Sequence, residues 1–374
     1  MATAAHTQLV TVGVDGSAVS QVAVDWAARA AALRSVPLKV VHVLNPPVVT
    51  AFPEVPMPAG FLQWQEDEGR RVLAAAIKTA QEAAHLLGAP ALEVSGDMVA
   101  GSSVPVLAEE STRAQLIVVG CRGRGALARG LLGSVSTGLV HHAHCPVAII
   151  HDEDPLMPHP SLAPVVVGVD GSPASERAVA IAFEEASLRG VDLVAVHAWS
   201  DTGLLEFPGA DWSQLQTGAE ETLSERLAGW AEHYPDVLVR RIVVADRPAH
   251  QLLEQAAAAQ LLVVGSHGRG GFAGMMLGSV STSVIHGARM PVIVARESRV
   301  VIVGGRVAPQ SPTAIPITAP PRPITRCVRF ISWCTPTPPS RSAPSAPADA
   351  RNHPRVSLPR NAAAVSRPPI SASR

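Results

Sequence analysis

A glycine-rich stretch with the make-up of a phosphate-binding loop occurs twice in this 374-residue chain. It begins at Gln115 as QLIVVGCRGRGALARGLLGSVST and returns 145 residues later, at Gln260, as QLLVVGSHGRGGFAGMMLGSVST. Glycine has no Cβ, so its backbone can come close to a ligand. The Gly-Ser pair in each copy opens a predicted helix, whose first N–H groups and dipole favour an anion. The doubled motif therefore predicts two sites for a phosphorylated ligand.

A carboxylate accompanies each glycine-rich stretch. The sequence VGVDGS ends at Ser17 and again at Ser172, which places Asp15 and Asp170 at the tips of predicted strands. A carboxylate in this position can accept hydrogen bonds from ribose hydroxyls or help to hold a metal ion. A single G-x-x-G-x9-G-S motif is more often a set of turns. Its duplication, each time after an apolar strand and downstream of VGVDGS, favours binding.

Short apolar strands alternate with helices in front of these motifs. The pattern predicts parallel sheets covered on both faces, with ligands beyond the carboxyl ends of the strands. An apolar stripe of Val22, Trp26, Ala30 and Leu33 marks the inward face of the first helix. Half 2 is expected to repeat the order of half 1 and to end in a strand at 291–295. The elements expected in half 1 are strands at 8–14, 38–44, 92–99, 116–119 and 146–150, and helices after Ser17 and at 61–87, 102–113 and 133–143.

The repeat divides the chain into two domains of ordinary size. Domain 1 spans 1–152 (half 1), a linker spans 153–162, domain 2 spans 163–298 (half 2), and a Pro/Arg/Ser/Ala-rich tail spans 299–374. Residues 300–374 hold ten arginines, one acid and 15 of the 33 prolines. Such a composition predicts disorder. Two interpretations of the tail stay open, a frameshifted extension and a basic arm that contacts nucleic acid.

Cysteine usage and hydropathy bear on the compartment. The four cysteines show no spacing typical of a disulfide framework, and MATAAHTQLV lacks the features of a leader. No apolar stretch approaches the roughly 18 residues that span a bilayer. We therefore expect a cytoplasmic protein without a membrane segment.

Three other groups of residues attract chemical interpretations that we discount. His141, His142, His144 and Cys145 have ligand-like types, but half 2 keeps only His286, so no metal site is expected. Cys121 is interpreted as a passive small residue rather than a redox switch, because Ser266 replaces it in half 2. Solvated helix faces are the expected positions of Glu109, Glu110, Glu184 and Glu185.

Over residues 8–296 the two halves resemble the tandem universal stress protein family, and its ATP-binding members share the glycine spacing. The resemblance implies a five-stranded parallel sheet of order 3-2-1-4-5 in each half, with adenine at the end of strand 2 and ribose at the acid. ATP, with Mg²⁺, is then the expected ligand. The implied binding residues are Gly13, Asp15, Val43, Gly120, Gly123, Arg124, Gly133, Ser134, Val135 and Ser136 in half 1, and Gly168, Asp170, Ala198, Gly265, Gly268, Arg269, Gly278, Ser279, Val280 and Ser281 in half 2.

The chain lacks the G-x-x-x-x-G-K-S/T loop of efficient ATPases. We therefore expect a regulatory ATP-binding protein with no catalytic residues, and at most slow hydrolysis. Two alternatives stay open: a slow ATPase or nucleotidyl-transfer enzyme, and a nucleotide-free interaction scaffold. Pairing through the fifth strands can form a homodimer or an internal pseudo-dimer, and nucleic acid is not an expected partner. Half 1 is predicted to bind triphosphate more tightly, because it has Arg122, Arg124 and Arg129 where half 2 has His267 and Arg269.

Overall fold

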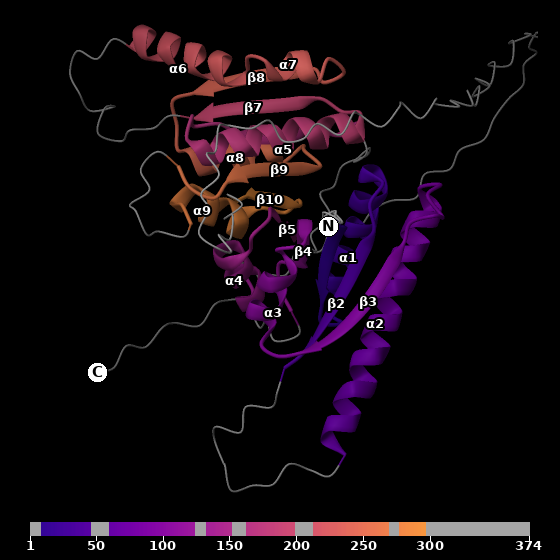
Figure 1. Cartoon of the computed structure of the whole chain (residues 1–374). Coiled ribbons are helices and arrows are strands. Elements are labelled where there is room, and N and C mark those ends of the chain that lie inside the picture. Colours follow the sequence, from indigo (N-terminus) through magenta and orange to yellow (C-terminus); the bar gives the residue numbers. More distant parts are fainter. Residues whose placement is uncertain are drawn as a thin grey trace, which may run out of the picture. The chain divides into compact units, whose positions relative to one another are not determined.

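The computed structural model describes residues 9–45, 60–123, 132–151, 162–198, 212–268 and 277–296 (Figure 1). The tail predicted at 299–374 lies outside these residues, as do Arg124, Arg129 and Arg269. The side chains of residues 212–215 lie outside the description as well.

Half 1 alternates strands and helices as the sequence predicts. Its elements are β1 (Leu9–Val14), α1 (Ala18–Arg34), β2 (Leu38–Leu44), α2 (Phe61–Leu86), β3 (Val94–Ala100), α3 (Ser103–Glu110), β4 (Ala114–Gly120), α4 (Ser134–His142) and β5 (Val147–Ile150).

Half 2 repeats this order with one addition, the short helix α7, which the sequence did not predict. Its elements are β6 (Val165–Gly168), α5 (Pro173–Arg189), β7 (Leu193–Ala198), α6 (Trp212–Leu227), α7 (Trp230–His233), β8 (Val239–Val244), α8 (Pro248–Ala256), β9 (Leu261–Gly265), α9 (Ser279–Gly287) and β10 (Val292–Ala295).

The strands of each half form a parallel sheet of the predicted order. Half 1 has the order β3-β2-β1-β4-β5, and half 2 has β8-β7-β6-β9-β10. The pairings within each half are parallel. Strand order therefore reverses between the first and fourth strands, and the acids and glycine loops follow these strands.

The two fifth strands join the sheets into one of ten strands. β5 and β10 pair in the antiparallel sense, with Ala148 opposite Ile293. This is the internal pairing through the fifth strands that the sequence suggested. Because the pairing is antiparallel, the strands of half 1 and half 2 run in opposite directions. Their carboxyl ends therefore point in opposite directions across the continuous sheet.

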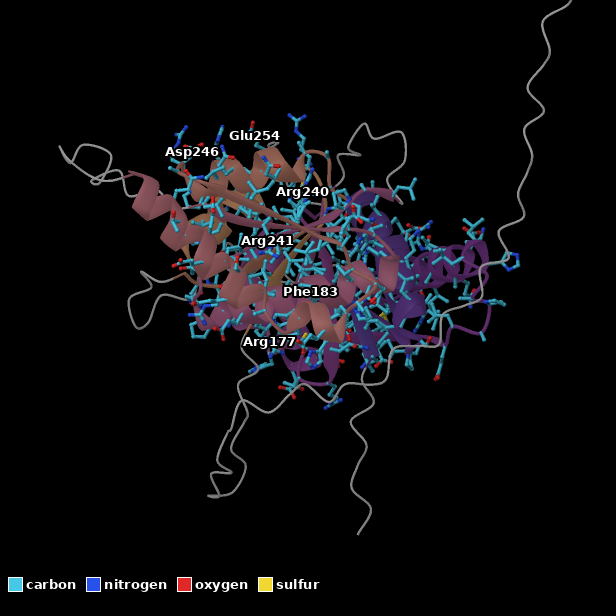
Figure 2. The ribbon with its side chains drawn as sticks, turned by 90° about the horizontal axis from the view of Figure 1, so that it is seen from above. Arg177, Phe183, Arg240, Arg241, Asp246 and Glu254 are labelled. Carbon is cyan, nitrogen blue, oxygen red and sulfur yellow. The ribbon has the colours of Figure 1, made fainter. Side chains whose placement is uncertain are left out.

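The sheet is buried on both faces, as a doubly wound fold requires. One apolar cluster packs α1, α2, α5 and α6 against the strands, and the other packs α3, α4, α8 and α9. In the first cluster Phe183, labelled in Figure 2, is fully buried. It stacks on Trp230 and Tyr234, with ring centroids 5.9 and 5.8 Å away. The extra helix α7 thus contributes aromatic cover to half 2.

The buried face of α1 differs from the predicted stripe. Val22 is 46% exposed, and Trp26 and Leu33 are only partly buried. Small side chains face the core instead, which lets the helix approach the sheet and its neighbours closely. The expectation is confirmed for Ala30 and was wrong for Val22, Trp26 and Leu33, because it followed the largest side chains. The buried residues of α1 are Val19, Ser20, Ala23, Val24, Ala27, Ala28, Ala30 and Ala31.

A buried ion triad links α1 of half 1 to α5 of half 2. The Glu185 carboxylate pairs with Arg34 and with Arg189, and its side chain has no exposed surface. Arg189 also lies over the Trp26 ring, 5.6 Å from its centroid. Burial alone would raise the pKa of Glu185, but the charges of Arg189 and Arg34 and their hydrogen bonds lower it.

The triad overturns part of the prediction for the acidic residues. Glu185 is not on a solvated face, because α1 covers that side of α5. Burial raises the pKa of the adjacent Glu184. In half 1, Glu110 is mostly buried and pairs with Lys39 at 2.7 Å. Glu109 is exposed as expected.

Candidate functional site

The acid of half 1 lies in a tight turn between β1 and α1, which we call the acid turn (residues 15–17; residues 170–172 in half 2). Asp15 Oδ1 accepts a hydrogen bond from the Ser17 N–H at 2.9 Å. Gly16 has φ +80°, a left-handed conformation that glycine adopts without strain. Ser17 caps α1 by accepting from the Ser20 N–H at 3.2 Å. These bonds fix the direction in which the carboxylate leaves the strand.

The second oxygen of Asp15 rests against the glycine loop, the segment from Gly120 to Gly133 (Gly265 to Gly278 in half 2). A Cβ built on Gly123 would lie 2.6 Å from Asp15 Oδ2, far inside van der Waals contact. A larger residue at position 123 would require the carboxylate to move from this position. The structure thus brings together two predicted residues that are 108 positions apart in the sequence.

Half 2 reproduces this arrangement. The Ser172 N–H donates to Asp170 Oδ1 at 2.9 Å, Gly171 has φ +76°, and Ser172 caps α5. A Cβ on Gly268 would lie 2.7 Å from Asp170 Oδ2. Since the two halves agree within about 0.1 Å at this contact, the pairing of acid and glycine is a shared feature of the fold.

The first glycine of each loop serves the packing of the fold. A Cβ on Gly120 would lie 2.9 Å from Val19 Cγ1 of α1, and one on Gly265 would lie 2.9 Å from the Ala174 carbonyl carbon of α5. These glycines let the first helix of each half press on the end of the fourth strand. Gly13 and Gly168 also belong to the predicted set. A Cβ on Gly13 would lie 2.9 Å from Leu107 Cδ1, and one on Gly168 would lie 3.1 Å from Leu252 Cδ1.

The Gly-Ser pairs begin helices, as predicted. Gly133 is the N-cap of α4 and Gly278 that of α9, and neither helix has a side-chain cap. The glycine N–H groups themselves donate to Cys121 O at 2.7 Å and to Ser266 O at 2.8 Å, which closes each loop. The N–H groups that start each helix therefore belong to the next three residues, which are Ser134, Val135 and Ser136 in half 1 and Ser279, Val280 and Ser281 in half 2.

The serine hydroxyls of this segment divide into two kinds. Ser134 and Ser279, the first residues of α4 and α9, are exposed. Ser136 is buried, and its hydroxyl lies 3.0 Å from Cys121 O and 3.2 Å from Gly120 O. Ser281 donates to Gly265 O at 2.6 Å. Ser136 and Ser281 belong to the binding residues that the resemblance implies, but main-chain carbonyls accept their hydroxyl protons, so these side chains hold the helix to the strand.

The ends of the second strands carry a feature that the sequence reading missed. Val43 is buried and Ala198 partly buried, where the resemblance places adenine. Beside them, His42 Nδ1 lies 2.8 Å from Val14 O, and His197 Nδ1 lies 2.6 Å from Val169 O. The available signal was the histidine near the end of the second strand in both halves.

The helix that follows the third strand is anchored differently in the two halves. In half 1, Asn45 Oδ1 accepts from the Ser103 N–H at 3.2 Å and from its hydroxyl at 3.0 Å, which joins the end of β2 to α3. In half 2, Asp246 follows β8 (Figure 2) and accepts from Gln251 Nε2 at 2.8 Å. That hydrogen bond lowers the pKa of Asp246. The borders of the two sites are therefore not equivalent.

The third residue of the glycine loop also differs. Arg122 is partly exposed in half 1. In half 2 its place is taken by His267, whose Nδ1 lies 3.0 Å from Ser266 Oγ. In addition, the Ser172 hydroxyl donates to His267 O at 3.3 Å. The acid turn and the glycine loop of half 2 are thus joined by a direct hydrogen bond.

The cysteines and the candidate metal ligands do not form a chemical site among the described residues. Cys121 is 3% exposed within the apolar core. Burial raises the pKa of the Cys145 thiol to about 12, which disfavours a thiolate ligand. Across the described residues, no three His, Cys, Asp or Glu side chains are arranged to hold a metal ion. Among the helices of those residues, none has the length and apolar character needed to cross a membrane.

Comparison with known proteins places these features in a family context. The model of the universal stress protein family matches residues 7–151 and 162–296. Universal stress protein Rv2005c of Mycobacterium tuberculosis is 57% identical over 290 residues, which cover 77% of this chain and 97% of that protein. Universal stress protein Rv2623 of the same organism is 56% identical over 289 residues, with 77% and 96% covered.

A solved structure shares the fold. The crystal structure of a universal stress protein from Archaeoglobus fulgidus superposes with a TM-score of 0.56 and 22% sequence identity. The match covers 78% of this chain and 97% of that one. The similarity therefore extends over both halves.

Proposed function

Because this chain belongs to the universal stress protein family, a family of stress-response proteins, we propose that it binds ATP in both halves. Occupancy of the two sites then biases its conformation or its binding to a partner. The few unpatterned cysteines support the cytoplasm as its compartment.

The contact between acid turn and glycine loop carries this proposal. In each half a carboxylate and a glycine from distant parts of the chain meet at the carboxyl end of a parallel sheet, where strand order reverses. Doubly wound folds bind ligands at this position. A carboxylate suits ribose hydroxyls, while a helix start without a side-chain cap suits phosphate.

Different residues then contact the adenine, the ribose and the phosphates of the nucleotide. The ends of β2 and β7, at Val43 and Ala198, flank the adenine. Asp15 and Asp170 accept from the ribose hydroxyls. The exposed glycines Gly123 and Gly268 and the first N–H groups of α4 and α9 contact the phosphates, with Arg124 and Arg269 nearby in the sequence. Bound Mg²⁺ would offset part of the phosphate charge.

Full-length protein offers the direct test. Mass spectrometry of the purified chain is expected to find ATP, and ATP with Mg²⁺ is expected to raise the melting temperature. A ligand at 100 times its Kd stabilises a folded protein by about 2.7 kcal/mol. Gly123→Val and Gly268→Val should each remove one bound nucleotide, because the new side chain collides with the acid, and the double variant should bind none.

A glycine without close neighbours provides the matched control. Among the described residues, no neighbouring atom lies within 4 Å of the place that a Cβ on Gly218 of α6 would occupy. Gly218→Val should therefore keep both nucleotides. Phosphate release above that of the double variant would favour the slow enzyme. A chain without bound nucleotide, and with a melting temperature that ATP does not change, would favour the scaffold.

A further inference from the structure

We propose that His42 and His197 are positioning residues that orient the ribose-binding carboxylates, an inference that rests on the proposed function. Each histidine belongs to the second strand of its half and bonds to the last residue before the acid. The atoms are His42 Nδ1 and Val14 O, at 2.8 Å, and His197 Nδ1 and Val169 O, at 2.6 Å.

The chemistry of this contact fixes the histidine tautomer. A carbonyl oxygen can only accept, so Nδ1 must carry the proton in both rings. The donor is present in the neutral and in the protonated imidazole. The hydrogen bond is therefore maintained whether or not the ring takes up a second proton.

The position of the carbonyl explains why this bond matters for the site. Val14 O belongs to the planar peptide unit that leads directly into Asp15. On the other side of Asp15 the chain turns through Gly16, at φ +80°. The histidine fixes the peptide plane before the acid, and the Ser17 N–H fixes Oδ1 after it at 2.9 Å. Between these two anchors the carboxylate has one direction, toward Gly123.

The His42 ring is itself held in place by packing against α2. A Cβ on Gly69 of α2 would lie 3.1 Å from His42 Cδ2, so the helix backbone closes over the ring. His197 is 6% exposed. Repetition in both halves, with the same ring nitrogen and the same carbonyl, shows that the contact accompanies the acid wherever the acid occurs.

Two substitutions separate this hydrogen bond from general packing. The side-chain nitrogen of asparagine is attached to Cγ, like His Nδ1, whereas that of glutamine lies one carbon farther. His42→Asn should therefore retain the bond to Val14 O, and His42→Gln should lose it. Val40→Ala, a buried change on the same strand, is the control for lowered stability alone.

The readout is discrimination between ATP and its 2′-deoxy and 3′-deoxy forms, measured by calorimetry on the full chain. A Gly268→Val background leaves half 1 as the one functional site. The parent and His42→Asn should bind ATP roughly threefold to tenfold more tightly than the deoxy forms, the usual value of a hydrogen bond. His42→Gln should bind ATP and the deoxy forms equally. Val40→Ala should discriminate as the parent does.

The outcomes distinguish this inference from the proposed function. Undiminished discrimination in His42→Gln, or its loss in His42→Asn, overturns the inference alone. A parent that binds no ATP overturns the proposed function and this inference together. Should His42→Gln not fold, His197→Gln in a Gly123→Val background repeats the test in half 2.

Nuclear magnetic resonance of the unsubstituted chain provides a second measurement. Long-range ¹H–¹⁵N spectra should show the Nδ1-protonated tautomer for both neutral rings. The opposite tautomer in either ring would overturn the inference.

Discussion

The acid turn and the glycine loop meet in both halves, but each half supplements this contact differently. Half 2 joins them by the hydrogen bond from the Ser172 hydroxyl to His267 O. In both halves the capping serine hydroxyl also accepts from an N–H of the first helical turn, and in half 1 Arg122 stands where half 2 has His267. Among the described residues, half 2 therefore has one additional hydrogen bond at this contact, and half 1 has an arginine at the position of His267.

This difference separates the residues that the two halves share from the neighbouring residues that they do not share. The carboxylate and the glycine next to it are the same in both halves, and a Cβ built on the glycine would lie 2.6 and 2.7 Å from the carboxylate oxygen. The neighbouring positions have changed in charge and hydrogen bonding. The two halves therefore share the geometry of the acid and the glycine and differ in the charge and hydrogen bonding around them.

The largest expected effect concerns the buried ion triad that links α1 of half 1 to α5 of half 2. Glu185→Ala leaves Arg34 and Arg189 buried without their common acid. Removing one partner of a buried ion pair costs about 3–5 kcal/mol. Urea unfolding should show this loss, whereas Glu109→Ala, an exposed change, should stay within about 0.5 kcal/mol of the parent.

The pH dependence of the same triad has a definite sign. The pKa of Glu185 is lower in the folded chain than in the unfolded one. Its contribution is therefore present above the ordinary glutamate pKa and is lost as the pH falls through the folded value. Glu185→Gln should weaken the acid dependence of stability, and an unchanged pH profile would contradict this account of the triad.

An intermediate effect is expected from exchanging the cationic position. With half 2 disabled by Gly268→Val, Arg122→His should lower ATP affinity about tenfold at low salt, since charge-assisted hydrogen bonds exceed neutral ones. Salt screens exposed charges, so the gap should narrow as ionic strength rises. His267→Arg, with half 1 disabled by Gly123→Val, should strengthen half 2. Equal affinities throughout would remove charge as the basis of the comparison.

The smallest effect tests the extra hydrogen bond of half 2. Ser172 and Ser17 are both N-caps, so replacing either with alanine loses the cap. Only Ser172→Ala also loses the bond to His267 O. We expect it to weaken ATP binding in half 2 about threefold more than Ser17→Ala weakens half 1, as one neutral hydrogen bond allows. Calorimetry on the two disabled backgrounds measures this difference.

Much of the fold and part of the site followed from local sequence. Residues 38–44 were expected to form a strand, and β2 has these bounds. The Gly-Ser pairs were expected to open helices, and α4 and α9 begin there. Such features depend on local spacing and on residue type. The roles of Ser136 and His42 could not be found in this way, because their partners come from other strands.

The sequence by itself determined the doubled α/β order and the positions of the acids and glycines, because strand and helix periodicity and the lack of a glycine side chain are local properties. Tertiary structure decided which surfaces were covered. Only the packing of α1 on α5 shows that Glu185 is buried between two arginines. Only the pairing of β1 with β2 sets His42 against Val14. Both depend on contacts between distant segments, which residue spacing along one element does not encode.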